Sequence, residues 1–269
     1  MKIDGRAIAE KIYQKLQTEV ATLPQAPTLG IVTCAPNAIT QQYLHIKKAR
    51  AEVLDIDVDI SMLEATATTD DIVKLVQEKS AKGVPLVVQL PLPAHIDTDA
   101  VLQALPIDCD VDGLRFVEVA DHPYLSPVAG AIAEIVYYQQ IPLEQKKVVI
   151  LGEGRLVGQP VAKWCRQVGA DVMVQNKDTF DPRVIKTADI VISGVGIPKL
   201  VRADMVKEGV VLLDVGTSGS AGTLQGDIDP ESYEKAPFYT PVPGGIGPIT
   251  IAVLLENVIQ ASKKQAQEG

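Results

Sequence analysis

The sequence predicts an α/β protein with two three-layer αβα units, each made of a parallel sheet between helices. Segments with strand and helix patterns alternate along the chain, and this order favours parallel sheets covered on both faces. Hydrophobic residues make up 46% of the 269 residues, but aromatic residues make up only 4%. The cores must therefore consist mainly of Val, Ile, Leu and Ala, which is typical of buried parallel strands.

The first half of the chain is expected to form alternating helices and strands. The segment 68–82 begins with Thr and Asp before an apolar periodic run, which is a helix start signal. Residues 106–128 are rich in Asp and Pro, and we expect loops there. The expected elements are helices 3–21, 38–53, 68–82 and 130–140 and strands 28–34, 56–63 and 85–93.

The second half contains a complete βαβ unit, in which strand 147–151 leads through a glycine turn into helix 156–168 and strand 171–175. Further strands are expected at 189–196 and 211–219, with helices between them. A loop rich in Pro and Gly then opens a long terminal helix. The pattern predicts a boundary between two α/β units near residue 128, and the last helix could pack on either unit.

Composition and charge argue against several classes of function. The net charge is −9 and no basic stripe is present, so we expect no nucleic-acid partner. No apolar run reaches the roughly 18 residues of a membrane span, so we expect no membrane partner. The cysteines and histidines are scattered without ligand-like spacing, which predicts a cytoplasmic protein without disulfides or a metal site. These residues are Cys34, Cys109, Cys165, His45, His95 and His122.

A glycine-rich turn between a strand and a helix is the first candidate binding site. Gly152, Gly154 and Gly158 follow strand 147–151 and precede the next helix. Glycine allows a sharp turn and the close approach of a pyrophosphate, which a helix N-terminus would bind. The pattern is GxGxxxG rather than GxGxxG, so a tight turn without a ligand is the alternative. The strand–turn–helix context favours a Rossmann-like dinucleotide-binding unit.

The residues near this turn leave the choice between NAD and NADP open. An NAD site often carries a carboxylate at the end of the second strand, on a ribose hydroxyl. This chain has Gln175, Asn176 and Lys177 there. Lys177 could bind the 2′-phosphate of NADP, whereas Glu153 in the glycine turn would repel it.

Four further segments have features that suit a ligand site. Tyr43 and Lys47 are four residues apart and share a helix face, although an ordinary helix surface is the alternative. Gln89 ends a buried apolar strand, where an open parallel sheet binds ligands, although it could be a structural amide. The acidic segment 108–113 is a solvated turn, an incomplete calcium loop, or a carboxylate site for a polar heterocycle. The stiff segment 240–250 either holds backbone groups beside a ligand or links two units.

These segments together resemble the bifunctional methylenetetrahydrofolate dehydrogenase/methenyltetrahydrofolate cyclohydrolase family. The resemblance covers nearly the whole chain and rests on several signatures in the right order. They are YLHIK (43–47), VVQLPLP (87–93), DVDG (110–113), LVGQPVA (156–162) and TPVPGGIGPIT (240–250), of which the last is the most specific.

The resemblance implies a reaction in two steps within one-carbon metabolism, which serves purine biosynthesis. A hydride passes from 5,10-methylenetetrahydrofolate to a nicotinamide, and water then opens the methenyl cation to 10-formyltetrahydrofolate. The resemblance also implies a folate-binding catalytic domain of residues 1–128 plus 243–269, a Rossmann-like domain of residues 129–242, an active-site cleft between them and a homodimer. NADP is the expected cofactor, with NAD possible.

The family's functional residues carry over to positions in this chain. Lys47 would be the main catalytic group, Tyr43 would stack on the folate, and Gln89 and Asp112 would hold the pterin edge, with Gln89 also near Lys47. The residues implied to bind the substrate are Tyr43, Val88, Leu90, Pro243, Gly244, Gly245 and Gly247. The residues implied to contact the dinucleotide are Gly152, Glu153, Gly154, Asn176, Lys177 and Thr217.

The chemistry of the second step is consistent with a catalytic lysine. Hydration of the methenyl cation needs a proton acceptor for water and later a proton donor to nitrogen. Repulsion between a lysine and the bound cation favours the neutral amine, so Lys47 could accept that proton.

The chain departs from the family pattern at four places. Cys109 stands where the family usually has Lys, and Thr40 replaces the serine near Tyr43, which is a milder change. Glu153 and Gly154 replace Arg-Ser at the dinucleotide turn, and Asn176-Lys177 replace His-Ser. The last two departures fall where a 2′-phosphate would bind, so they put NADP preference in question. The alternatives are a monofunctional dehydrogenase or cyclohydrolase of this family, or a non-catalytic folate- or nucleotide-binding protein.

Overall fold

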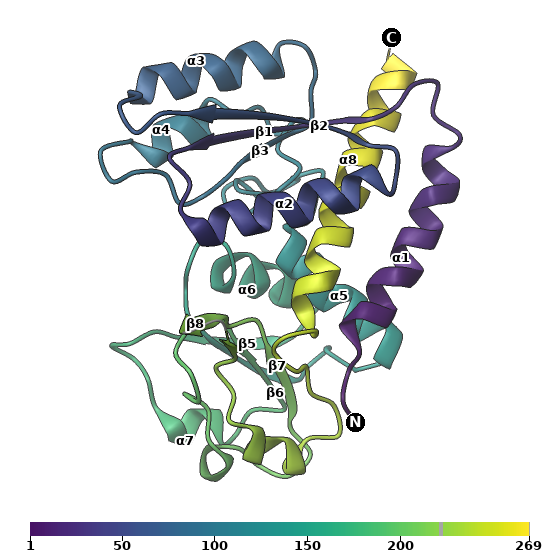
Figure 1. Cartoon of the computed structure of the whole chain (residues 1–269). Coiled ribbons are helices and arrows are strands. Elements are labelled where there is room, and N and C mark those ends of the chain that lie inside the picture. The colour runs from purple at the N-terminus through teal and green to yellow at the C-terminus, as the bar shows by residue number, and fades with distance from the viewer. Residues whose placement is uncertain (221–222, 269) are drawn as a thin grey trace. The chain divides into compact units, whose positions relative to one another are not determined.

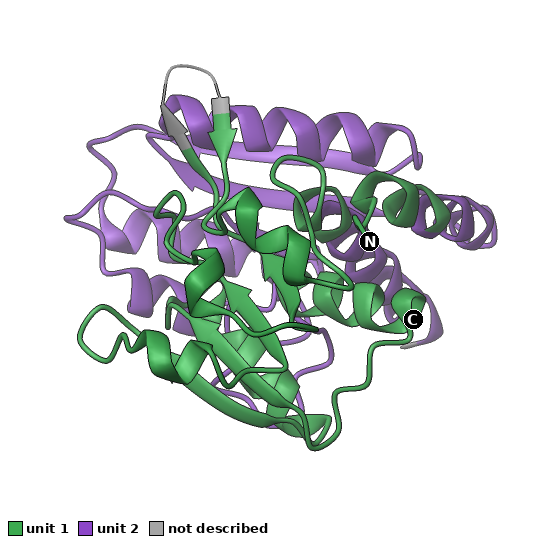
Figure 2. Ribbon diagram, turned by 90° about the horizontal axis from the view of Figure 1, so that it is seen from below, with its two compact units in different colours: residues 1–11, 127–250 green, residues 12–126, 251–269 purple. Residues whose placement is uncertain are grey.

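The computed structural model describes residues 1–220 and 223–268 and confirms the α/β fold (Figure 1). By contacts within the chain, the residues form two compact units. Unit 1 comprises residues 1–11 and 127–250, and unit 2 comprises residues 12–126 and 251–269 (Figure 2). The predicted domains, 1–128 plus 243–269 and 129–242, stay a prediction.

Unit 2 contains a parallel sheet in the order β2-β1-β3. Its strands are β1 (Thr28–Cys34), β2 (Asp57–Leu63) and β3 (Leu86–Val88). Thr28 pairs with Asp57 and Gly30 pairs with Leu86, so each strand begins beside its neighbour's first residues. The crossovers are α2 (Ala38–Glu52) and α3 (Thr69–Ser80). Val32 and Val88 are buried because this sheet is covered on both faces.

The helices of unit 2 lie on opposite faces of this sheet. Helix α3 and the short α4 (Thr98–Gln103) lie on one face, and α2 lies on the other (Figure 1). Helix α3 starts at a capping box in which the side chains of Thr68 and Asp71 each accept a backbone N–H of the other residue. The core on that face contains Val32, Cys34, Ile72, Val76, Leu86, Val88, Ile96, Val101, Leu102, Leu105, Cys109 and Leu114.

Two long helices contribute to both units. These are α1 (Gly5–Val20) and α8 (Ile246–Glu268). Within unit 2, the side chain of Asn257 in α8 donates hydrogen bonds of 2.9 Å to the carbonyl oxygens of Val111 and Leu125. Because Asn257 is buried, these bonds fix the irregular segment between α4 and residue 127.

Unit 1 contains a four-stranded parallel sheet in the order β5-β4-β6-β7. The strands are β4 (Lys147–Leu151), β5 (Asp171–Gln175), β6 (Ile190–Ser193) and β7 (Val211–Asp214). Helices α5 (Pro127–Gln139) and α6 (Gly158–Gln167) pack on one face. On the other face, α7 (Pro182–Ile185), η1 (Ala203–Met205) and η2 (Pro230–Lys235) enclose a second core, which includes Val149, Leu151, Ile185, Val191, Met205 and Leu212.

The structure differs from several expected element boundaries. The expected strand 85–93 is only β3 (Leu86–Val88), because Pro91 and Pro93 cannot donate to the sheet, and the expected strand 189–196 ends at Ser193. The expected strand 211–219 ends at Asp214, and an antiparallel hairpin of β8 (Ser218–Ser220) and β9 (Thr223–Gln225) follows. The strand ends there because the Asp214 carboxylate accepts the backbone N–H groups of Gly216, Asp227 and Ile228, which turns the chain out of the sheet. Helix α4 was not expected, because six residues carry too little periodicity. The helices expected between the later strands are short: α7 has four residues and η1 is a 3₁₀ helix of three residues.

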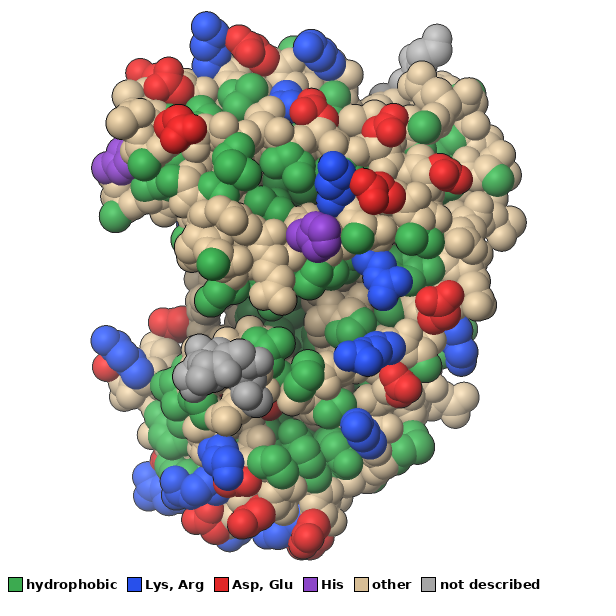
Figure 3. All heavy atoms as spheres, viewed as in Figure 1, with side chains coloured by type: hydrophobic (Ala, Val, Ile, Leu, Met, Phe, Trp, Pro, Cys, Tyr) green, Lys and Arg blue, Asp and Glu red, His purple; other side chains and the backbone are tan. Residues whose placement is uncertain are grey.

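The surface carries both signs of charge. On the face shown in Figure 3, acidic and basic side chains are interspersed over both units. None of the helices in the described part of the chain combines the length and the apolarity that a bilayer span requires.

Candidate active site

Helix α2 presents Tyr43 and Lys47 on one face. The helix begins at Asn37, whose side chain accepts the N–H of Thr40 at 2.9 Å, and it packs through Thr40, Leu44 and Ala51. Tyr43 is 41% exposed, which leaves its ring free of the core. Lys47 lies one turn further along and is half-buried.

Lys47 is held by the amide side chain of Gln89. The Lys47 Nζ donates to Gln89 Oε1 at 2.9 Å, although 42 residues separate the two. Gln89 follows β3 directly, and its Nε2 donates to the carbonyl oxygen of Leu90 at 2.9 Å. Because that bond takes the NH₂ group, the amide oxygen faces the lysine. The structure thus brings together the cation of α2 and the carboxyl end of β3.

The residues on either side of Gln89 lie in different surroundings. Val88 has 0% exposure and packs in the core against α3, so its side chain points away from any ligand. Leu90 is partly buried at the edge of the same core. Their roles in substrate binding stay predictions.

The three carboxylates of the acidic segment serve three different purposes. Asp108 forms an exposed ion pair with Lys264 at 2.6 Å. Asp110 is buried and accepts the N–H groups of Leu114 and Arg115 at 3.0 and 2.8 Å, and it pairs with the buried His122 at 3.1 Å. Asp110 therefore has a structural role in holding this loop. Because its carboxylate is removed from water, it must find hydrogen-bond partners within the protein.

Asp112 is the carboxylate of this segment that interacts with Lys47. Burial raises the pKa of the Asp112 carboxyl, and the positive charge of Lys47 opposes this increase. The next residue, Gly113, has a φ of +60° and lies against the backbone of Ser126, so only glycine fits there without strain. Lys47, Gln89 and Asp112 thus form one polar cluster in unit 2, which we call the lysine cluster.

The Pro/Gly loop of residues 240–247 belongs to unit 1. Gly244 has a φ of +98°, and its carbonyl oxygen accepts the N–H of Gly5 at 3.1 Å. Gly245 is buried against Gly5, whereas Pro243 and Gly247 are exposed. The loop is therefore a fixed structure that leads into α8. The predicted contacts of Pro243, Gly244, Gly245 and Gly247 with folate stay predictions.

The glycine turn between β4 and α6 has the shape that a pyrophosphate requires. Gly152 has a φ of +97°, and a Cβ on Gly158 would lie 1.9 Å from the Gly152 carbonyl oxygen. A Cβ on Gly154 would meet no atom within 4 Å, so the space outside the turn is open. Helix α6 begins without a side-chain cap, and the positive end of its dipole faces the turn, which favours an anion. These residues fit a dinucleotide.

The remaining residues predicted to contact the dinucleotide lie around this turn or in loops of the same unit. The Asn176 Nδ2 donates to Glu153 Oε1 at 2.9 Å, which joins the glycine turn to the end of β5. Lys177 and Thr217 are exposed. The assignments of all of these residues stay predictions.

Sequence reasoning missed a buried carboxylate pair at the ends of β6 and β7. The Asp227 Oδ2 accepts the hydroxyl of Ser193 at 2.7 Å and the N–H groups of Val195 and Gly196 at 2.8 and 3.2 Å. Burial raises the pKa of Asp214 to about 7. Hydrogen bonds from the backbone N–H groups of Ile228, Asp227 and Gly216 oppose this increase. An Asp directly after an apolar strand is the sequence signal that could have found this pair.

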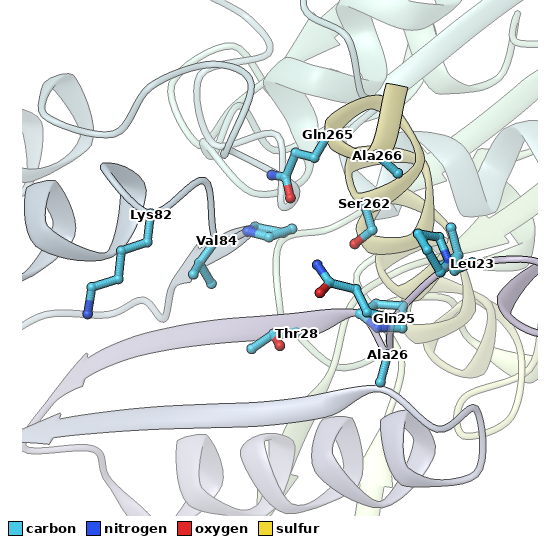
Figure 4. Close-up of a pocket in the computed structure, with 12 residues that line it drawn as sticks. Leu23, Gln25, Ala26, Thr28, Lys82, Val84, Ser262, Gln265 and Ala266 are labelled. Atoms are coloured by element: carbon cyan, nitrogen blue, oxygen red, sulfur yellow. The ribbon is translucent and has the colours of Figure 1, made fainter. Parts of the chain in front are cut away.

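A separate pocket in the described part of unit 2 is lined by none of the predicted site residues. This pocket of about 400 Å³ lies between the start of β1 and the C-terminal part of α8 (Figure 4). Backbone and small or amide side chains line it, including Gln25, Ser262 and Gln265. In the described residues, no group of three or more His, Cys, Asp or Glu side chains is arranged to hold a metal ion.

Comparison with known proteins agrees with these two sites. The model of the tetrahydrofolate dehydrogenase/cyclohydrolase catalytic domain matches residues 3–112, and the model of the NAD(P)-binding domain of the same family matches residues 126–266. The bifunctional protein FolD of Staphylococcus aureus (strain bovine RF122 / ET3-1) is 35% identical over 276 residues, which cover 97% of this chain and 96% of the relative.

Solved structures show the same similarity. The bifunctional enzyme FolD of Campylobacter jejuni has a TM-score of 0.94 and 32% identity, covering 98% of this chain and 99% of that one. The Trypanosoma brucei enzyme, solved with NADP cofactor and an inhibitor, has a TM-score of 0.91 and 30% identity, covering 98% of each chain. The predicted resemblance and the NAD(P)-binding unit are therefore confirmed, and the chain belongs to the tetrahydrofolate dehydrogenase/cyclohydrolase family.

Proposed function

We propose that this protein oxidises 5,10-methylenetetrahydrofolate to 5,10-methenyltetrahydrofolate with NAD(P) and then hydrolyses the product to 10-formyltetrahydrofolate. The observation that carries the proposal is the lysine cluster, in which an amine on α2, an amide after β3 and a buried carboxyl meet. A protein that only binds folate has little need for a cation beside a cationic ligand.

Each residue of the lysine cluster has a role in the hydrolytic step. Lys47 in its neutral form accepts the proton of the water that attacks the methenyl carbon, and it returns a proton to the nitrogen as the ring opens. Gln89 holds the Lys47 amine through the 2.9 Å bond, so the amine does not depend on the ligand for its position. Asp112 binds the polar edge of the pterin, and the Tyr43 ring stacks on it.

The residues of unit 1 supply binding rather than proton transfer. When bound, the nicotinamide accepts the hydride that leaves the methylene carbon. The glycine turn and the N-terminus of α6 would hold the pyrophosphate. We also propose the domain boundaries given by the resemblance, the folate-binding role of the 243–247 loop, a homodimer, a cytoplasmic location and a place in one-carbon metabolism that serves purine biosynthesis.

Replacing Lys47 tests the proposal. Lys47→Gln is expected to lower the cyclohydrolase rate by about 10²–10⁴-fold, because the proton acceptor is lost. Binding of methenyltetrahydrofolate, measured by equilibrium dialysis, should remain within a few-fold. Lys48→Gln is the matched control, since Lys48 is exposed and lies 4.0 Å from Glu52. Its rate should equal that of the unmodified protein.

Separate assays of the two steps distinguish the alternatives. Formation of NAD(P)H reports the oxidation, and loss of methenyltetrahydrofolate absorbance reports the hydrolysis. One activity without the other indicates a monofunctional enzyme, and neither activity with retained binding indicates a binding protein. If Lys47→Gln hydrolyses its substrate at the unmodified rate above the spontaneous background, the role of Lys47 is wrong.

A further inference from the structure

The turn that follows β5 fixes the orientation of one amide group. The Asn176 Oδ1 accepts the N–H groups of Asp178 and Thr179 at 2.9 and 3.0 Å and the hydroxyl of Thr179 at 3.1 Å. With three donors around the oxygen, the flipped amide would place its NH₂ group against N–H donors. The Asn176 Nδ2 must therefore point away from its own turn, toward the glycine turn.

The group that receives this amide is the carboxylate of Glu153. The Nδ2 of Asn176 lies 2.9 Å from Glu153 Oε1. Strands β4 and β5 are neighbours, and Leu151 pairs with Gln175. Glu153 and Asn176 thus follow paired residues at the carboxyl ends of two adjacent strands. One carboxylate oxygen is held by the amide, and the side chain is exposed, so the other oxygen faces solvent or a ligand.

This position is where a dinucleotide-binding unit contacts the adenosine ribose. A carboxylate near the end of the second strand accepts the ribose hydroxyls of NAD. In this chain the strand end supplies an amide, and the carboxylate comes from the glycine turn instead. A phosphate monoester at the 2′ position carries about −1.5 to −2 charges at neutral pH, so the same carboxylate would repel it.

Acidic and basic side chains are equal in number in the two turns around Glu153. The glycine turn and the β5 turn together contain Glu153, Arg155, Lys177 and Asp178, two acidic and two basic residues. Lys177 is exposed and is followed directly by Asp178. Of the two acidic side chains, Glu153 is the one that the Asn176 amide orients.

We propose that the Glu153–Asn176 pair makes this protein select NAD over NADP, with Glu153 accepting the adenosine ribose hydroxyls. This inference rests on the proposed use of a dinucleotide. It resolves the opposing sequence arguments from Lys177 and Glu153 in favour of Glu153, because the carboxylate is fixed by a neighbouring strand end.

Binding of NAD and NADP to the full-length protein without folate tests the inference directly. Isothermal titration calorimetry should give a Kd for NAD at least about tenfold lower than for NADP. In Glu153→Ser, the ratio of the two Kd values should fall by at least about tenfold, mainly because NADP binds more tightly. Asn176→Ala should change the ratio in the same direction by less, since the carboxylate remains but is no longer oriented.

Asp178→Asn is the matched control, because it removes the same charge from the adjacent turn. It should change the ratio less than Glu153→Ser does. An equal change would mean that general charge repulsion, not the oriented Glu153 carboxylate, sets the ratio, and it would overturn the proposal. Tighter binding of NADP by the unmodified protein, an unchanged ratio in Glu153→Ser, or no binding of either dinucleotide would also overturn it. NAD selection without oxidation of methylenetetrahydrofolate would refute the proposed function and leave this inference standing.

Discussion

The two units build their candidate sites from different parts of the polypeptide. In unit 2, the lysine cluster consists of side chains that bind one another, with the 2.9 Å bond between Lys47 and Gln89 at its centre. In unit 1, the glycine turn consists of backbone, and its shape depends on the absence of side chains at Gly152 and Gly158. We propose that the first site transfers protons and that the second holds an anion.

This difference determines what a substitution does in each unit. Replacing Lys47 or Gln89 should remove the catalytic group and leave the core of unit 2 packed. Neither residue belongs to that core, which includes the preceding residue Val88. Adding one carbon to the glycine turn forces the backbone apart, because protein interiors do not absorb extra atoms without strain. The glycine turn should therefore be the more fragile of the two sites.

Apart from Lys47→Gln, the largest effect is expected for Gly158→Ala. The added Cβ would lie 1.9 Å from the Gly152 carbonyl oxygen, so the turn must open. Dinucleotide affinity should fall by about 100-fold or more, equivalent to about 2.7 kcal/mol. Overpacking should also lower the free energy of unfolding by about 1–3 kcal/mol. Calorimetric titration with NAD and urea unfolding measure the two effects.

Gly154→Ala sharpens the comparison, because no atom lies within 4 Å of the Cβ position at Gly154. Its unfolding free energy should match that of the unmodified protein, so any loss of dinucleotide binding would report a direct contact with the ligand. Wild-type affinity in Gly158→Ala would show that the close approach in this turn is not needed for binding.

A smaller effect is expected for Gln89→Leu in unit 2. The substitution keeps a similar volume but removes the acceptor that lies 2.9 Å from the Lys47 amine. The cyclohydrolase rate should fall by about tenfold, or about 1.4 kcal/mol, because the amine is no longer held in place. Stopped-flow hydrolysis of methenyltetrahydrofolate gives the rate.

Gln103→Leu is a suitable comparison for that experiment, since Gln103 is an exposed amide at the end of α4. It should leave the rate unchanged. Equal rates for Gln89→Leu and the unmodified protein would mean that Gln89 does not position Lys47.

The parallel sheets could be predicted from the sequence because strand and helix patterns alternate and the core is mainly aliphatic. Strands 28–34, 147–151 and 171–175 were predicted with the observed boundaries, since neighbouring glycine, polar or charged residues mark their ends. The pattern does not predict α4 or the hairpin of β8 and β9, which are too short to show a period.

The sites could be predicted only in part, because contacts between distant residues carry no local signal. The helical spacing of Tyr43 and Lys47 is visible in the sequence, but the choice among three uses of the acidic segment is not. The structure shows that Asp110 turns inward to His122 whereas Asp112 interacts with Lys47. Similarly, the opposed charges of Glu153 and Lys177 could be weighed only after the bond from Asn176 was known.

The smallest effect concerns the buried carboxylate pair of unit 1. Burial raises the pKa of Asp214 from 3.8 to about 7, so between these values the folded protein holds a proton that the unfolded chain has released. The free energy of unfolding contributed by this group is therefore fully present at low pH and is lost as the pH rises through about 7. The slope should be on the order of 1 kcal/mol per pH unit.

Urea unfolding between about pH 5 and about pH 7 measures this slope. Asp214→Asn removes the titrating proton, so the slope should become shallower. The amide NH₂ group of the variant faces backbone N–H donors, so the free energy of unfolding should also be lower at every pH. Asp204→Asn should keep the full slope, because its side chain is 73% exposed. Identical slopes in the unmodified protein and Asp214→Asn would mean that Asp214 is already ionised near pH 5, and that the backbone N–H groups outweigh burial at this carboxylate.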